Sequence, residues 1–299
     1  MYTACSPIYA HPLPAGHRFP MEKYELLPQQ LLHEGTLEPK DFHEPAKMAD
    51  EVILLAHDTD YWQRLKSLQL TGSEIRRTGF PLSAQLVQRE ITIAQGTLDG
   101  TLHALEHGIA FNIAGGTHHA FTNAGEGFCL LNDQAIAANY LLHQCLVKQI
   151  LIVDLDVHQG NGTAQIFQHE PRVFTFSMHG AKNFPHRKEV SDLDIALPDG
   201  ITDGPYLALL EEALLKLIAQ VKPDFIFYLC GVDVLATDKL GRLGLTIDGC
   251  KQRDKLVLGT AHELGIPVQV SMGGGYSADV WQIIEAHANT FRVAKSLWG

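Results

Sequence analysis

Short apolar runs alternate with amphipathic segments over the last two thirds of the chain. The apolar runs are rich in Val, Ile and Phe, which is typical of strands buried on both faces of a parallel sheet; they lie at residues 108–114, 149–157, 172–178, 224–230 and 266–272. The segments between them have the spacing of amphipathic helices, at residues 133–148, 205–220 and 248–264. We expect Asp248 to be the N-cap of the last helix, which should stop before Gly265 and Pro267. This alternation predicts an α/β fold, a doubly wound and mostly parallel sheet with helices on both faces.

The first hundred residues carry a weaker pattern, which predicts helices and loops, with helices at residues 44–56 and 83–107. The chain contains no internal repeat, low-complexity tract or linker-like segment, and its 299 residues can bury one large core. We therefore expect a single domain spanning residues 1–299.

Composition limits the classes of protein that the chain can belong to. No apolar run approaches the ~20 residues of a membrane-spanning helix, and residues 1–10 lack the features of a secretory signal, so we expect a cytoplasmic protein that does not bind membranes. The five cysteines are scattered without a C-x-x-C pair, which favours buried thiols over disulfides or a cysteine-built zinc site. The net charge is -11 with no basic run, which argues against nucleic-acid binding. Such a charge would mildly favour cationic substrates, although it also serves solubility.

Polar, glycine-rich sequence follows four of the predicted strands. In a doubly wound sheet, ligands bind beyond the carboxyl ends of the strands, so these segments should meet at one edge. The chain is also rich in histidine, with 16 residues, and several of them stand in or beside these segments. The four segments are G-G-T-H-H (115–119), H-Q-G-N-G (158–162), G-V-D (231–233) and G-G-G-Y (273–276).

A metal site is predicted after the second of these strands. Asp154, Asp156 and His158 are spaced by two, which would direct their side chains the same way in an extended segment. Asp233, after another strand, is the expected third ligand beside Asp156 and His158. Nitrogen and oxygen donors without a thiolate suit zinc, although ferrous iron or cobalt could bind the same set. Three protein ligands leave a position open for water, as a catalytic site requires.

The remaining candidates surround this metal site. His118 and His119 are expected to act as acid–base groups, because imidazole titrates near neutral pH. Asp154 behind one histidine would favour its charged form, whereas the amide of Asn161 would hold the other without that bias. Tyr276, on its glycine-rich turn, could donate a hydrogen bond to an oxyanion. Two aromatic residues near the glycine-rich segments, Phe128 and Phe184, could wall a narrow channel or belong to the core.

Taken together, these segments resemble the arginase–deacetylase superfamily, and specifically the zinc-dependent histone deacetylases, most like their class IV branch and its bacterial relatives. The resemblance rests on five motifs and on the opening H-R-F-P-M-E-K-Y (17–24). The motifs are G-G-T-H-H-A (115–120), G-F-C-L-L-N-D (127–133), D-L-D-V-H-Q-G-N-G-T (154–163), G-V-D-V-L-A-T-D-K-L-G (231–241) and G-G-G-Y (273–276).

The resemblance implies a role for each matching residue. One zinc ion would be held by Asp156, His158 and Asp233, with the catalytic residues His118, His119 and Tyr276 beside it. The substrate tunnel would be lined by Gly127, Phe128 and Phe184. A structural potassium ion would be bound by Asp154, Asp156, His158, Ser177 and Met178, and Arg18 would line an internal channel for acetate release. The sequence departs from the family pattern at Asn161, where some members carry Asp, and at residues 76–80, which offer no carboxylate to grip a substrate backbone.

We expect a zinc-dependent amidohydrolase that removes acyl groups from lysine side chains of proteins or peptides, or from an acetylated small amine such as an acetylpolyamine. A binuclear manganese ureohydrolase on the same fold would need further Asp and His ligands around D-x-D-x-H, and would hold two ions instead of one. A non-catalytic binder of acyl-lysine would need neither the histidine pair nor Tyr276. The sequence fixes neither the acyl chain length nor the oligomeric state.

Overall fold

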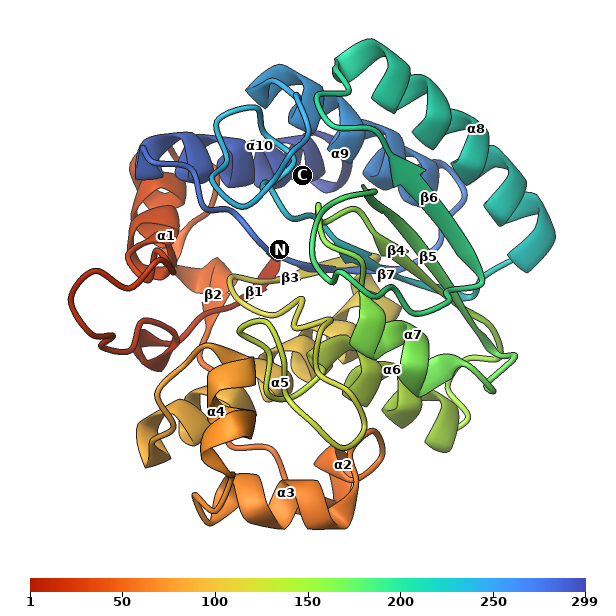
Figure 1. Cartoon of the computed structure of the whole chain (residues 1–299). Coiled ribbons are helices and arrows are strands. Elements are labelled where there is room, and N and C mark those ends of the chain that lie inside the picture. The colour runs from red at the N-terminus through yellow and green to blue at the C-terminus, as the bar shows by residue number, and fades with distance from the viewer.

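The computed structural model describes residues 1–299, and a single sheet of eight strands runs through its centre (Figure 1). The strands are β1 (Tyr2–Ala4), β2 (Phe42–His43), β3 (Ile109–Asn112), β4 (Ile150–Asp154), β5 (Val173–Gly180), β6 (Leu193–Leu197), β7 (Phe225–Leu229) and β8 (Val268–Ser271). Their order in the sheet is β2-β1-β3-β8-β7-β4-β5-β6, and every pair is parallel. The predicted parallel α/β sheet is therefore confirmed.

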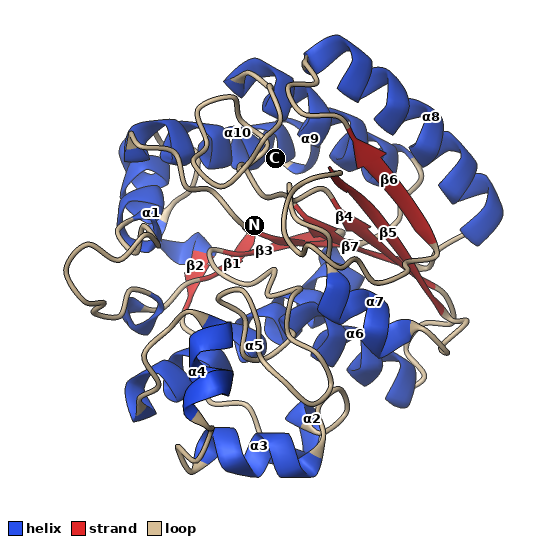
Figure 2. Cartoon of the chain, in the orientation of Figure 1, coloured by secondary structure: helices blue, strands red, loops and turns tan.

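Helices cover both faces of the sheet. In the view of Figure 2, α1, α8, α9 and α10 lie above it, and α2 to α7 lie below it. The helices are α1 (Lys23–His33), α2 (Asp50–Ile53), α3 (Thr59–Lys66), α4 (Gly72–Thr78), α5 (Ala84–His107), α6 (Asp133–His143), α7 (Asn161–Phe167), α8 (Asp203–Val221), α9 (Ile247–Glu263) and α10 (Val280–Trp298). Two short 3-10 turns, Pro7–Tyr9 and Pro39–Asp41, complete the elements. No helix is long and apolar enough to cross a membrane.

The direction of winding reverses between β4 and β7, which are neighbours in the sheet. From β4 the chain continues through α7 to β5 on one side, whereas from β7 it continues through α9 to β8 on the other side. The loops that leave two such strands diverge and open a crevice beyond their carboxyl ends, where doubly wound proteins bind ligands. The segments 155–162 and 230–238 leave the sheet at this crevice.

The strongly apolar strands are recovered within a few residues of their predicted bounds. β4 and β7 are buried at every position, as their continuous apolar sequence predicts. The predicted strand 149–157 ends earlier, at Asp154, because the chain bends over residues 156–158. The spacing by two in D-x-D-x-H therefore does not describe an extended segment.

Two predicted helix features are wrong. Only Asp50–Ile53 is helical within residues 44–56. Pro45 disfavours a helical backbone at Glu44, so a helix does not begin there. The N-cap of α9 is Thr246, not Asp248: the Thr246 side chain accepts a hydrogen bond from the backbone N–H of Gly249. Ser83 caps α5 in the same way by accepting from Leu86.

The weakly patterned elements were not predicted individually. β1 and β2 are too short to show a period, and β6, an edge strand, alternates between half-buried and exposed positions before the buried Leu197. α10 was not predicted either, although it buries ten side chains against the rest of the molecule. Both helical layers and the sheet share one core cluster of 77 buried residues.

Candidate active site

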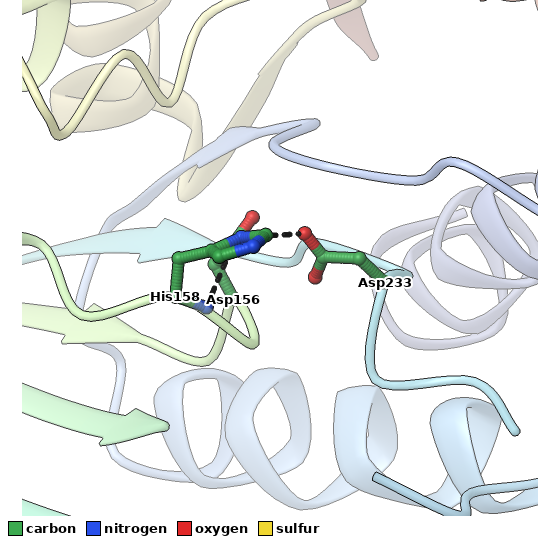
Figure 3. Close-up of side chains that lie close together, drawn as sticks. All are labelled: Asp156, His158 and Asp233. Atoms are coloured by element: carbon green, nitrogen blue, oxygen red, sulfur yellow. Dashed lines mark hydrogen bonds and ion pairs between the residues drawn. The ribbon is translucent and has the colours of Figure 1, made fainter. Parts of the chain in front are cut away.

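Two aspartates and one histidine meet at the crevice between β4 and β7. Asp156 and His158 come from the bend after β4, and Asp233 points toward them from the segment after β7 (Figure 3). His158 Nδ1 lies 2.9 Å from Asp156 Oδ1 and 3.2 Å from Asp233 Oδ2. One potential ligand atom from each residue lies within 4.8 Å of the other two, and all three residues are buried. The loops of the two strands thus bring together the three residues that were predicted as metal ligands.

This cluster has the properties of a cation site. Backbone N–H groups hold both carboxylates: Val157 donates to Asp233 Oδ1 at 2.9 Å, and Gly274 donates to Asp156 Oδ2 at 2.8 Å. Asp233 Oδ2, in contrast, is buried and accepts from no backbone N–H; its polar neighbour is His158 Nδ1 at 3.2 Å. A Cβ atom on Gly274 would lie 2.0 Å from this same oxygen, so only glycine leaves the space free. Two buried carboxylates this close together are costly unless a cation binds them, so the residues fit a divalent metal.

The charges in this cluster are strongly coupled. Burial, followed by the negative charge of Asp156, raises the pKa of Asp233 to about 7. Burial alone would lower the pKa of His158, but hydrogen bonding to Asp156 and Asp233 outweighs it and raises this pKa to about 10. In the protein without metal, the positive charge of His158 therefore compensates part of the negative charge of Asp156 and Asp233, as a metal ion would.

His118 and His119 lie side by side, with ring centroids 4.1 Å apart, and have different partners. His118 Nδ1 donates to Asp154 Oδ2 at 2.7 Å, and His119 Nδ1 lies 2.6 Å from Asn161 Oδ1. Burial lowers the pKa of His118, but the Asp154 carboxylate more than compensates and raises it above its ordinary value. Burial and the positive charges of His118 and His158 hold the pKa of His119 well below its ordinary value. One imidazole is thus biased toward the charged form and the other toward the neutral form.

The orientation of Asn161 was not foreseen and depends on Glu126. Asn161 Nδ2 donates to Glu126 Oε2 at 2.7 Å, so its Oδ1 must face His119. An amide oxygen accepts, so Nδ1 of His119 carries the proton and Nε2 is the basic nitrogen. The other oxygen of Glu126 accepts from Arg77 Nε at 2.9 Å. No sequence signal connected Glu126 with the histidine pair.

Two carboxylates, the buried Asp133 and the half-buried Asp238, hold the glycine-rich turns in place. Asp133 accepts from the backbone N–H groups of Gly116 and Thr117, at 3.1 and 2.8 Å, and so fixes the turn before the histidine pair. Asp238 accepts from the backbone N–H of Tyr276 at 2.6 Å. Both residues stand in the motifs G-F-C-L-L-N-D and G-V-D-V-L-A-T-D-K-L-G, but only their contacts reveal these positioning roles. Burial raises the pKa of Tyr276 well above its ordinary value, so its hydroxyl keeps its proton.

Two connected cavities lead to these residues. The outer one, of about 440 Å³, is lined by Gly127, Phe128 and Phe184 among others. The inner one, of about 40 Å³, is lined by His118, Asp156 and Arg89 among others. The two share five lining residues, so the inner cavity is the floor of the outer one; these are His119, Gly127, Phe128, His158 and Tyr276. Gly127 has φ of +54°, and a Cβ there would lie 2.7 Å from the His119 ring, so glycine keeps this passage open.

Arg18 is not at the inner cavity, which corrects the prediction that it lines an internal channel. It is exposed and lines the outer cavity, with its Cζ 5.0 Å from the centroid of the Phe128 ring. The chain bends at Arg18 and Phe19, and the Phe19 side chain packs into the core while that of Arg18 stays exposed. The buried cations at the inner end are Arg89 and Lys23, whose Nζ donates to Gly273 O at 3.2 Å. Burial lowers the pKa of Lys23 to about 8.

The five residues predicted to bind potassium lie in β4, in the bend that follows it, and in the neighbouring strand β5. Asp154 and Ser177 are paired in register across the two strands, and Met178 is the next residue of β5. Asp154 also positions the segment that carries the metal-ligand candidates, because its Oδ1 accepts from the backbone N–H of Asp156 at 3.1 Å. The residues are therefore neighbours, and potassium binding itself stays a prediction.

Comparison with known proteins assigns the family. The histone deacetylase domain family model matches residues 17–291, and the chain belongs to this family. Histone deacetylase 2 of Arabidopsis thaliana is 30% identical over 278 residues, which cover 90% of this chain and 72% of the plant protein. An uncharacterized protein of Picosynechococcus sp. is 46% identical over 292 residues, which cover 98% of this chain and 97% of the relative.

Solved structures share the fold. A histone deacetylase homologue from Aquifex aeolicus superposes with a TM-score of 0.85 at 23% identity, covering 98% of this chain and 83% of that one. A histone deacetylase homologue complexed with SAHA superposes with a TM-score of 0.83 at 24% identity, covering 99% of this chain and 88% of that one.

Proposed function

We propose that this protein is a zinc-dependent amidohydrolase that removes short acyl groups, above all acetyl, from lysine side chains of proteins or peptides. The observation that carries the proposal is the convergence of two metal-ligand candidates, two histidines and a tyrosine on one small cavity. These residues are Asp156, His158, His118, His119 and Tyr276. The family membership supports the same reaction class.

The metal would be held by Asp156, His158 and Asp233. When bound there, zinc supplies a Lewis acid that polarises an amide carbonyl and lowers the pKa of water to ~7. The two buried carboxylates and the absence of thiolates support a hard or borderline cation at this position. From the resemblance to the histone deacetylases, we also propose a structural potassium ion beside Asp154 and Ser177.

The chain's own groups would move the protons. His119 is neutral and presents Nε2, so it accepts a proton from the attacking water as the new C–O bond forms. The amide C–N bond then breaks, and His119 returns the proton to the leaving amine. His118, charged beside Asp154, stabilises the negative charge that develops nearby. Tyr276 keeps its proton and donates a hydrogen bond to the carbonyl oxygen as that oxygen becomes negative.

The cavities favour a short acyl group on a long, thin stem. Phe128, Gly127 and Phe184 line the passage, which suits the aliphatic part of a lysine side chain. The inner cavity of about 40 Å³ has room for only two or three water-sized groups. Its lining includes the buried guanidinium of Arg89, which would oppose a long aliphatic chain. Acetyl therefore fits this floor better than a fatty acyl group.

The proposal is tested by measuring turnover of a panel of substrates. The panel contains lysine peptides that carry acyl groups from acetyl to long-chain acyl, and acetylated polyamines. The zinc-loaded protein should hydrolyse acetyl-lysine fastest, and Asp233→Ala should abolish the activity. Asp248→Ala, which removes an exposed carboxylate that is not among the metal-ligand candidates, is the matched control and should keep it. Absence of turnover on every member by a protein that contains zinc would reject the amidohydrolase, and SAHA could then be tested as a ligand of a non-catalytic pocket.

A further inference from the structure

The mouth of the outer cavity carries a group of arginines, although the protein as a whole is acidic. Arg18, Arg76 and Arg77 line this cavity, and Glu126 is the only carboxylate among its 14 lining residues. The whole chain has 34 acidic and 23 basic residues, so the excess of positive charge at the entrance is opposite in sign to the net charge of the protein. We define the cationic rim as Arg18, Arg76 and Arg77.

The negative charge of Glu126 does not neutralise the whole rim. One of its oxygens accepts from Arg77, at 2.9 Å from Nε, and the other accepts from Asn161. Both oxygens are therefore engaged, and the single charge of Glu126 faces the positive charges of three arginines. Arg18 and Arg76 are exposed and form no ion pair with any carboxylate of the chain. Two guanidinium groups are thus free to bind an anion from outside.

The position of Arg18 connects the cationic rim with the reacting group. Its Cζ lies 5.0 Å from the centroid of Phe128, whose ring lines both the outer cavity and the inner one. A lysine stem that passes Phe128 would leave its own backbone at the level of Arg18 and Arg76. Since consecutive Cα atoms are only about 3.8 Å apart, the residues on each side of the acylated lysine stay at the mouth of the outer cavity, where the long, exposed side chains of Arg18 and Arg76 can reach them.

We propose that this cationic rim selects acyl-lysine with acidic neighbours, namely peptides in which Asp or Glu flanks the modified residue. The proposal rests on the deacylase function above and names its substrate class. Arg18 and Arg76 bind the flanking carboxylates, and the passage between Phe128 and Phe184 receives the acylated side chain. An acetylated polyamine carries ammonium groups instead, which the same guanidinium groups repel. The local charge at the entrance therefore outweighs the mild preference for cationic substrates that the net charge of -11 would give.

A matched set of acetyl-lysine peptides tests this selection. The peptides share length and sequence except that the residues on each side of the acetyl-lysine are Asp, Ala or Lys. We expect kcat/KM to fall in that order, with about a threefold to tenfold advantage of Asp over Lys at low salt, as exposed charge pairs typically give. The advantage should shrink toward one as the ionic strength rises to about 0.5 M, because solvent-exposed charges are screened.

Variants connect the selection with particular residues. In the double variant Arg18→Ala and Arg76→Ala, the ratio of kcat/KM for the Asp and Lys peptides should approach one. Arg172→Ala is the control, since Arg172 is an exposed arginine just before β5, at the opposite end of the sheet, and it should keep the ratio of the parent protein. An unchanged ratio in the double variant, or equal rates on the Asp and Lys peptides in the parent protein, would overturn the proposal.

A binding measurement separates this proposal from the deacylase function. Fluorescence anisotropy of the same labelled peptides reports their affinity whether or not they are hydrolysed. Weaker binding of the Asp peptide by the double variant, without turnover of any peptide, would retain the cationic rim and reject the deacylase. Turnover of all three peptides at equal rates and with equal affinity would retain the deacylase and reject the cationic rim.

Discussion

At the scale of single residues, the two histidines of the site have different hydrogen-bond partners at Nδ1. His118 has the carboxylate of Asp154 and His119 has the amide of Asn161, at 2.7 and 2.6 Å. The amide supplies an acceptor without a charge, so the pKa of His119 stays low and its Nε2 is free to accept a proton. In the proposed mechanism, this difference between a carboxylate and an amide separates the general base, His119, from the electrostatic partner, His118.

Replacement of this amide by a carboxylate should move the pH dependence of activity. In Asn161→Asp the new charge favours the imidazolium form and raises the pKa of His119. Since His119 must be neutral to accept a proton, the acid limb of kcat/KM should shift to higher pH, by about one pH unit or more. Glu126→Gln is combined with this change, because Glu126 lies 2.7 Å from Asn161 and would otherwise repel the new carboxylate. Glu126→Gln alone is the control, and an acid limb that is the same in both variants would contradict the assignment of His119.

Tyr276 allows a test of the oxyanion donor. Tyr276→Phe removes only the hydroxyl and keeps the ring that packs with Phe19 at a centroid distance of 5.9 Å. Loss of one such donor typically lowers kcat by about 10²- to 10³-fold, and we expect a loss of this size with KM little changed. The metal content should stay that of the parent protein, since no metal-ligand candidate is altered. Undiminished kcat would mean that Tyr276 only lines the cavity.

At the scale of elements, helix α9 holds the end of β7 through a buried ion pair. Arg253 donates from NH1 to Gly231 O at 2.6 Å and from NH2 to Cys230 O at 3.1 Å, just before Asp233. Its partner Asp254 also accepts from Tyr228 on β7, at 2.6 Å, and both charged residues are fully buried. The pair therefore connects the helix with the segment that presents a metal-ligand candidate.

Removal of one member of this pair should destabilise the protein strongly. Arg253→Met leaves Asp254 buried without its cation and frees two carbonyl groups, a change that typically costs about 3–5 kcal/mol. Thermal or denaturant unfolding measures this loss. Arg172→Met, which removes an exposed and paired arginine, should change stability by no more than about 0.5 kcal/mol. Equal stability of the two variants would show that the Arg253–Asp254 pair contributes nothing to the fold.

Sequence reasoning succeeded where burial leaves a periodic or continuous pattern and failed where contacts are non-local. β4 and β7 are apolar throughout, and their glycine-rich continuations correctly indicated the edge at which Asp156 and Asp233 meet. β2, with two residues, has no pattern to detect. Glu126 reaches Asn161 across 35 positions, and a contact of that kind leaves no local trace. Arg18 was misplaced because adjacent side chains diverge, a choice that depends on how Phe19 packs.

At the scale of the whole molecule, the reversal of winding between β4 and β7 explains why the site forms at all. Two loops that leave neighbouring strands in opposite directions place Asp156 and Asp233 face to face, although 76 positions separate Val157 from its acceptor Asp233. Backbone donors then fix the two carboxylates before any ligand arrives. The fold maintains two buried carboxylates close together, an arrangement that disfavours the folded state unless a positive charge joins them.

A metal ion should therefore stabilise the folded protein, and the number of ions distinguishes the reactions that this fold could support. A ligand that binds only the folded state adds about 2.7 kcal/mol at a hundredfold excess over its Kd. For a chain of this size we expect Tm to rise by about 5–10 °C on saturation with zinc. Asp233→Ala should abolish this shift, whereas Asp248→Ala should keep it. Analysis for divalent metal should find one ion per chain, because the only cluster of divalent-metal ligand candidates in the chain is Asp156, His158 and Asp233. Two divalent ions per chain would instead favour a binuclear ureohydrolase, and a zinc-induced rise of Tm that survives in Asp233→Ala would place the metal elsewhere.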